Sequence, residues 1–196
     1  MIQFLLILII FNSAFGRSAP NSTAKLDVDD RIYRGKKVEI VEFPYVVSIL
    51  ENNKQECGGS LYKKDIVITA AHCLWEILSL EKLKVRLGSS KHNSGGVIKK
   101  VKSFKVHPKY NPITHEYDIG VIHLESPVEL TTSIQTIELA KSQPTAGSTA
   151  TVVGWGSTEK NEYPAQIRAV VLKTISNSEC ASKSYKYGSD ILDNMI

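Results

Sequence analysis

The sequence of 196 residues has no apolar run long enough to cross a bilayer. Its longest run, Phe4–Phe11, has eight residues, whereas a membrane-spanning helix needs about 20. It also has no internal repeat, no coiled-coil pattern and no low-complexity segment. Hydrophobic residues make up 42% of the chain and charged residues 22%, which is typical of a globular domain and excludes a fibrous or disordered chain.

Neither positive nor negative charge strongly predominates over the whole chain. There are 24 Lys and Arg against 20 Asp and Glu, a formal net charge of +4. We interpret the basic residues as scattered over a solvated surface. Nucleic-acid binding usually needs a clustered basic stripe, so the composition predicts no nucleic-acid partner.

The apolar run near the N-terminus is followed by small residues, Ser13, Ala14 and Gly16. This order is typical of a secretory signal peptide, and we predict one over residues 1–16 with cleavage after Gly16. A membrane anchor is the less favoured alternative. The prediction implies a secreted, extracellular protein with no membrane association once the signal is removed.

Cysteine is scarce and odd in number, with Cys57, Cys73 and Cys180. In an oxidising compartment one pair can form and one cysteine is left over. The remaining cysteine would form an intermolecular disulfide, stay a free thiol, or pair with a cysteine that is missing from this sequence. The chain stops at Ile196 with no polar tail or Gly and Pro punctuation, so we expect that it ends before the domain does.

Short runs rich in Val and Ile, separated by turn residues, predict an all-β sandwich or barrel. The expected strands are Tyr45–Leu50, Asp65–Thr69, Lys84–Leu87, Val97–Val106, Ile119–Leu124 and Ala150–Val153. Two stretches, 70–80 and 176–183, read as helical. Pro and Gly over 144–147 suggest a boundary between two lobes.

One candidate site lies around His72. The sequence CGGSL begins at Cys57, and TAAHC ends at Cys73, directly after His72. A disulfide across this span would contribute about 3 kcal/mol and hold His72 in place. A zinc site of these three residues is an alternative, although there is no CxxC pair and no fourth ligand at a usual spacing. Taken alone, a His beside a Cys is more often structural.

A second candidate is Asp118, in YDIGVI at the head of an apolar run. Alone, such an Asp is more often a turn residue. Beside His72, a carboxylate that accepts the imidazole N–H would select its tautomer and stabilise the imidazolium. We interpret Tyr110 and the other four histidines as structural or surface residues. These histidines are His92, His107, His115 and His123.

These motifs, with VVGWGST at 152–158, resemble the chymotrypsin-like, trypsin-type serine endopeptidases. The resemblance implies a two-lobed antiparallel β-barrel fold over 32–196, with a first barrel at about 32–140 and an incomplete second barrel at about 141–196. It implies that His72 is the general base and then the general acid, that Asp118 orients it, and that Cys57 pairs with Cys73. The separation of 46 residues between His72 and Asp118 agrees with the family's spacing.

The same resemblance places an activation site between Arg31 and Ile32, which makes residues 17–31 a propeptide and the protein a zymogen. In the family, the freed amine of Ile32 would insert into the body and order the oxyanion hole. Tyr33 and Arg34 are bulkier than the residues usual there. The implied partners are protein or peptide substrates, an activating protease and protein inhibitors. No cofactor and no metal are implied.

A nucleophile is what the sequence lacks. No serine after Asp118 lies in Gly-Asp-Ser-Gly-Gly, and Gly188-Ser189-Asp190 is without the glycines that shape an oxyanion hole. We therefore expect an inactive fragment of a secreted, trypsin-like endopeptidase whose specificity-pocket residues and catalytic serine lie beyond Ile196. The alternative is a non-catalytic homologue that acts by binding or regulation.

Overall fold

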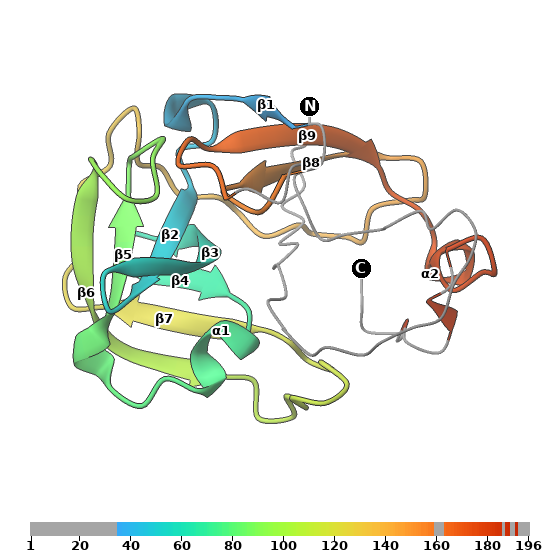
Figure 1. The fold of residues 1–196 in the computed structure, drawn as a ribbon, viewed down its shortest axis with the longest axis horizontal. Helices are drawn as coiled ribbons and strands as arrows, with labels where there is room; N and C mark the ends of the chain where they lie inside the picture. The colour runs from blue at the N-terminus through green and yellow to red at the C-terminus, as the bar shows by residue number, and fades with distance from the viewer. Residues whose placement is uncertain (1–34, 159–162, 186, 189–190, 192–196) are drawn as a thin grey trace.

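A computed structural model describes residues 35–158, 163–185, 187–188 and 191, and it consists mostly of β-strands. A closed six-stranded barrel lies beside a separate three-stranded sheet (Figure 1). The all-β, two-lobed fold with an incomplete second lobe is therefore confirmed. The predicted signal peptide, the propeptide, the Arg31–Ile32 bond and Ser189 lie outside the described residues.

The barrel is antiparallel throughout, with strands in the order β2-β3-β4-β7-β6-β5. These strands are β2 (Val46–Glu51), β3 (Lys54–Lys63), β4 (Ile66–Thr69), β5 (Leu83–Leu87), β6 (Val97–Val106) and β7 (Gly120–Leu124). In β5 and β7 every second side chain is buried, as expected for strands with one face on the core. The β-branched residues that predicted strands fill that core, among them Val47, Val67, Val85 and Ile122.

The second sheet contains β1 (Lys36–Lys37), β9 (Arg168–Lys173) and β8 (Thr149–Gly154), in the order β1-β9-β8. Lys36 pairs with Ala169, so a strand from the range predicted for the first barrel joins the second sheet. A guanidinium nitrogen of Arg168 donates to the carbonyl oxygen of Gly35 at 2.7 Å. The chain is thus fixed to β9 from its first described residue.

A second apolar cluster joins the sheet to the barrel. It contains Phe43 and Val46 from the start of the barrel, together with Trp155 and Ile167 from the second lobe. The Trp155 indole N–H donates to the carbonyl oxygen of Ser90 at 3.0 Å, and the backbone N–H of Ile167 donates to the same oxygen at 2.7 Å. These contacts hold the second sheet on the barrel.

Helices are short. They are the 3-10 turns η1 (Ile40–Glu42) and η2 (Leu80–Lys82) and the α-helices α1 (His72–Trp75) and α2 (Asn177–Cys180). The helical ranges predicted at 70–80 and 176–183 are thus each reduced to one turn. Only Leu74 of α1 is buried, so no apolar face holds a longer helix on the barrel. No helix among the described residues has the length and apolarity that crossing a membrane requires.

Candidate active site

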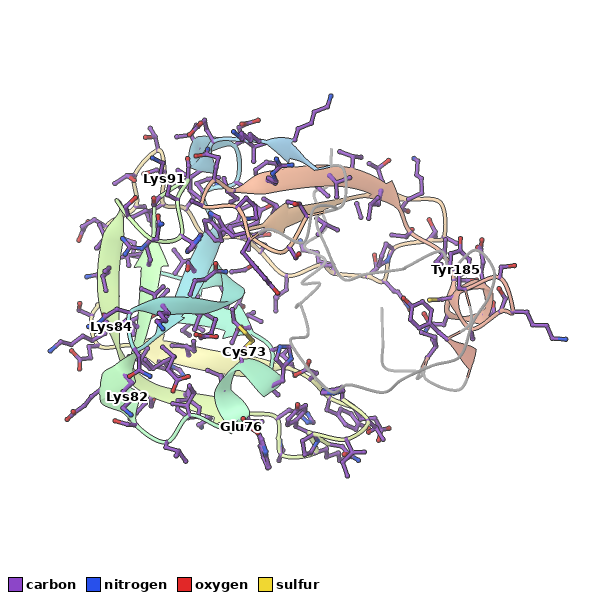
Figure 2. The ribbon with its side chains drawn as sticks, viewed as in Figure 1. Cys73, Glu76, Lys82, Lys84, Lys91 and Tyr185 are labelled. Atoms are coloured by element: carbon purple, nitrogen blue, oxygen red, sulfur yellow. A yellow bond between two sulfur atoms is a disulfide. The ribbon has the colours of Figure 1, made fainter. Side chains whose placement is uncertain are left out.

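His72 is held by the barrel on its N-terminal side and by a disulfide on the other. It follows β4 through Ala70 and Ala71, both fully buried, and it begins α1. Cys57 of β3 and Cys73 form a disulfide with their Cα atoms 6.1 Å apart. The sulfur atoms are visible in yellow beside Cys73 in Figure 2. The imidazole therefore projects from a short, braced segment.

Asp118 meets His72 with both carboxylate oxygens. Oδ2 lies 2.7 Å from the imidazole Nδ1, and Oδ1 accepts the backbone N–H of His72 at 2.8 Å. Side chains of the pair are 17% and 19% exposed, so both are largely shielded from water. Because a carboxylate only accepts, Nδ1 carries the proton, and the neutral ring keeps a lone pair on Nε2.

The loop before β7 sets the position of Asp118. Asn111 organises it, because its carbonyl oxygen accepts the N–H of His115 at 2.8 Å and its side-chain oxygen accepts the N–H of Ile113 at 2.9 Å. His115 and Tyr117 have φ angles of 57° and 55°, the left-handed region that non-glycine residues rarely adopt. The turn therefore places Asp118 beside His72, and it requires a left-handed backbone conformation at both His115 and Tyr117.

Gly120 brings this loop against α1. A Cβ at Gly120 would lie 2.7 Å from Cδ1 of Leu74 and 3.1 Å from the carbonyl oxygen of Ala70. Both distances are shorter than ordinary van der Waals contacts. The absence of a side chain at Gly120 lets the start of β7 approach α1 closely enough for Asp118 to reach His72.

Electrostatics favour an ionised Asp118. Burial of the carboxyl acts to raise the pKa of Asp118, but the hydrogen bonds from the His72 ring and backbone and the charge of the ring outweigh it. The net pKa of Asp118 lies below its ordinary value of 3.8. A carboxylate that stays ionised can stabilise a proton taken up by the His72 ring.

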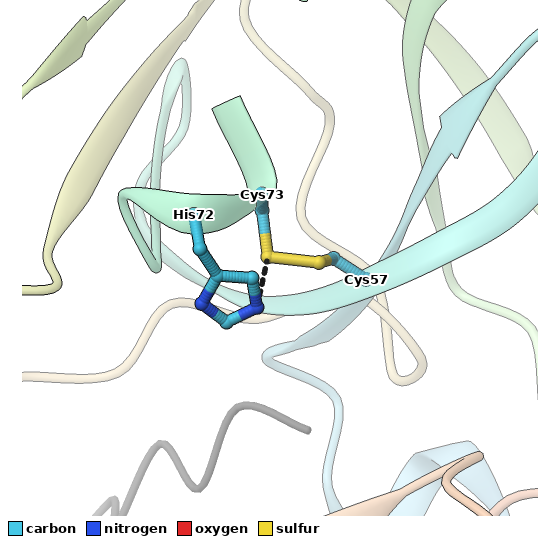
Figure 3. A group of neighbouring side chains, drawn as sticks. All are labelled: Cys57, His72 and Cys73. Carbon is cyan, nitrogen blue, oxygen red and sulfur yellow. Dashed lines mark hydrogen bonds between the residues drawn. A yellow bond between two sulfur atoms is a disulfide. The ribbon is translucent and has the colours of Figure 1, made fainter. Parts of the chain in front are cut away.

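The residues of the zinc alternative do lie together. One ligand atom from each of Cys57, His72 and Cys73 falls within 4.8 Å of the others. However, the two sulfur atoms are bonded to each other and offer no thiolate to a metal. Nε2 of His72 lies 3.5 Å from Sγ of Cys73, as Figure 3 shows. The cluster therefore consists of an imidazole ring beside a disulfide, and it does not offer a set of zinc ligands.

His115 and Tyr110 lie beside His72, although the sequence predicts only a structural or surface role for each. The His115 ring stands edge to face with that of His72, with centroids 6.4 Å apart. Its Nδ1 lies 3.3 Å from the Tyr110 hydroxyl, and Tyr110 contacts Trp75 of α1 edge-on. Only the turn at 111–118 brings these rings together, and no motif signals it.

Burial also affects the ionisation of these two neighbours. Burial lowers the pKa of His115, as does the charge of His72, while Asp118 acts to raise it. Burial, with the charges of Asp118 and Glu76, raises the pKa of Tyr110 to about 12. Both side chains are therefore neutral near pH 7.

Cys180, the third cysteine, is free and half-buried at the end of α2. It lies in the second lobe, and the disulfide of the barrel does not involve it.

Comparisons with known proteins identify a family and a fold that this chain resembles. A family model described as Trypsin matches residues 32–196. Trypsin alpha-4 of Lucilia cuprina is 42% identical over 197 residues, which covers 100% of this chain and 76% of that protein. Trypsin delta of Drosophila erecta is 41% identical over 198 residues, covering 100% and 78%. The crystal structure of a scabies mite inactivated protease paralogue, S-D1, superimposes with a TM-score of 0.72 at 27% identity, covering 80% of this chain and 68% of that one.

Proposed function

Because the chain belongs to the trypsin family of serine proteases, we propose that His72 and Asp118 are the general base and its orienting carboxylate in a secreted serine endopeptidase. The observation that carries this proposal is the 2.7 Å contact between Nδ1 of His72 and Oδ2 of Asp118. A base needs a fixed tautomer, and the second hydrogen bond, from the His72 backbone to Oδ1, keeps the carboxylate in register with the ring.

The proposed chemistry is acyl transfer. Nε2 of His72 takes the proton of a serine hydroxyl as that oxygen attacks the scissile carbonyl, and it returns the proton to the leaving amine. Ionised Asp118 stabilises the imidazolium that forms between these two steps. The substrate class is protein or peptide, and protein inhibitors would occupy the same site. No metal or cofactor takes part in these steps.

The 196 residues themselves contain no serine in a Gly-Asp-Ser-Gly-Gly setting. We propose that this stretch alone does not hydrolyse peptides and that the nucleophile is encoded after Ile196. The test is to read the coding sequence downstream and to produce both the 196-residue chain and the extended one. A fluorophosphonate probe should label a serine only in the extended protein, and stoichiometric labelling of the 196-residue chain would contradict the proposal.

Matched variants of the extended protein test the two assigned roles. After activation, His72→Ala and Asp118→Asn should each lower kcat by about 10³-fold or more while the protein remains folded. Lys63→Ala, on an exposed barrel turn, should leave kcat unchanged. A normal kcat in either site variant would refute the assignment.

The zymogen and secretion proposals rest on residues outside the described part of the chain. We propose that an activating protease cleaves between Arg31 and Ile32 after a signal peptide is removed at Gly16. The disulfide between Cys57 and Cys73 supports passage through an oxidising compartment. N-terminal sequencing of the secreted protein, before and after limited tryptic digestion, should give Arg17 and then Ile32.

A non-catalytic homologue is the second candidate. It is favoured by the likeness to a scabies mite protein described as an inactivated protease paralogue, together with the lack of a nucleophile motif in the 196 residues. A stop codon after Ile196, or a downstream sequence with the serine replaced, would decide for this candidate over the enzyme.

A further inference from the structure

One segment of the barrel carries positive charge without any negative charge. Residues 82–109, which include β5 and β6, contain nine Lys or Arg and no Asp or Glu. The net charge of the whole chain is only +4 because acidic residues elsewhere in the sequence offset the positive charge of this segment. The basic residues are therefore concentrated in this region, contrary to the scattered distribution inferred from the overall composition.

The strand register places four of these lysines on the outside of the barrel, and we call them the basic row: Lys84, Lys100, Lys102 and Lys105. Val101 is buried in the core, so its neighbours Lys100 and Lys102 point outward. The register shifts between Val101 and Ser103, after which Phe104 packs on the core and Lys105 faces out.

Lys84 extends the basic row onto β5. It lies between the buried residues Leu83 and Val85, and its Cα is the direct partner of Lys100 across the two strands. Figure 2 shows Lys82, Lys84 and Lys91 along this side of the barrel, away from Cys73 and the candidate active site.

These charges are not neutralised within the described part of the chain. Like charges directly opposite one another in a sheet are destabilising, and Lys84 and Lys100 are such a pair. Among the described residues, none of these lysines forms an ion pair; the one contact of that kind joins His72 to Asp118 and is ionic only when the imidazole is protonated. Glu125 lies near through a hydrogen bond from its N–H to the Lys100 carbonyl oxygen, but its carboxylate pairs with none of these lysines. A bound anion would therefore remove an internal repulsion.

One exposed apolar side chain lies at one end of the basic row. Ile98, the second residue of β6, shares the outward face of Lys100 and Lys102 and is 45% exposed. Ile98 is the direct strand partner of Arg86, so apolar and cationic groups alternate there. Charge alone would suit a nucleic acid or a sulfated polysaccharide, but neither gains from exposed aliphatic groups, and no aromatic ring projects from the row to stack on bases.

We propose that the outer face of β5 and β6 is a docking surface for an extended acidic peptide segment of a partner protein, with an apolar residue of the peptide seated on Ile98. Alternate side chains of an extended peptide lie about 7 Å apart, as do outward-facing positions along β6. Successive carboxylates can thus face successive lysines. This surface is separate from the candidate active site and does not depend on its chemistry.

The test measures fluorescence anisotropy of a short fluorescein-labelled peptide of alternating glutamates with two leucines at one end, titrated with the 196-residue chain. Lys100→Glu combined with Lys102→Glu should weaken binding about tenfold or more. Lys63→Glu combined with Lys64→Glu, the same charge change at the β3–β4 turn, should change it less than about twofold. Binding of the native chain should weaken as salt rises.

Folding of the row variant is not expected to fail, because Lys100→Glu places opposite charges across from Lys84. Ile98→Ser should weaken binding of the leucine-containing peptide but leave an all-glutamate peptide unaffected. The proposal is overturned if the peptide does not bind, or if both double variants weaken it equally. It is also overturned if duplex DNA or heparin binds the row more tightly than the peptide and is insensitive to Ile98→Ser.

Discussion

Asp118 performs two tasks with one carboxylate, since it holds the ring of His72 through Oδ2 and the backbone of the same residue through Oδ1. TAAHC and the apolar run after Asp118 selected both residues only through the resemblance to the trypsin-type family, because each motif alone favours a structural role. The second hydrogen bond was not predictable, because it depends on a backbone N–H that becomes available only where α1 begins.

Replacing Asp118 with Asn should lower the free energy of unfolding by about 1–3 kcal/mol at pH 7, since one charged acceptor becomes a donor facing N–H groups. The pKa of Asp118 is depressed in the folded state, so its contribution is complete above its ordinary value of 3.8 and is lost as pH falls through the folded pKa. Urea unfolding from pH 7 down to pH 2 should show the difference between the native chain and Asp118→Asn shrinking at the acid end. A constant difference would contradict the assigned ionisation.

The imidazole of His115 gives a second test at this scale. Burial and the charge of His72 lower its pKa below 6.5 while Asp118 acts to raise it. An NMR titration of the native chain should place the midpoint of His115 below 6.5, and Asp118→Asn should move it lower still. A rise in that midpoint on removal of the carboxylate would show that Asp118 does not act on His115.

Among the elements, the contact between α1 and the start of β7 decides whether the site assembles. Gly120→Ala should destabilise the protein by about 1–3 kcal/mol, because the added methyl would overlap Leu74 and press on the carbonyl of Ala70. Gly58→Ala is the matched control, since a Cβ there meets only the carbonyl oxygen of Val47 at 3.9 Å. Equal effects of the two substitutions in thermal unfolding would show that close packing at Gly120 is unimportant.

The disulfide between β3 and α1 is also an element-scale feature. Substituting Cys57 and Cys73 together by Ser should lower the free energy of unfolding by about 3 kcal/mol, as expected for closing a loop of this length. Chemical denaturation at neutral pH measures this loss. An unchanged denaturation midpoint would mean that the barrel alone holds the segment that carries His72.

Predictability at this scale follows the apolar pattern only in part. Strands with several Val and Ile, such as β6 and β7, were evident from the sequence, whereas β9 was not among the expected strands although RAVVLK is also apolar. By contrast, β3 was missed because KQECGGSLYK is polar and glycine-rich, and its strand conformation comes from pairing with β2 and β4 on either side. The helix expected at 70–80 shrinks to one turn because tertiary packing buries only Leu74.

For the whole molecule, a closed barrel is joined to a sheet of three strands that remains open. Among the described residues, β8 pairs only with β9, and Val171 and Leu172 of β9 are 64% and 47% exposed. Such a sheet has fewer buried contacts than the barrel, whose strands are all paired on both sides. The two lobes should therefore differ in local stability.

Hydrogen exchange followed by mass spectrometry checks this difference. Amides of β8 should exchange about tenfold faster or more than those of β4 and β7, each of which is paired on both sides within the closed barrel. Peptides covering β2 provide the internal reference. Uniform protection across both lobes would indicate that the molecule opens as a single cooperative unit.

Pairing between Gly35 and Arg168 limits how far a newly made N-terminus can travel. If the backbone is cut after Arg31, only residues 32–34 precede Gly35, whose carbonyl oxygen accepts a hydrogen bond from Arg168. Residues 32–34 together with Gly35 itself span at most about 14 Å when extended, so the liberated ammonium of Ile32 would stay within that distance of the Gly35 carbonyl group, which is held at the edge of β9. If the ammonium pairs with an acidic group, that group has to lie within this distance, on the second lobe's side of the molecule.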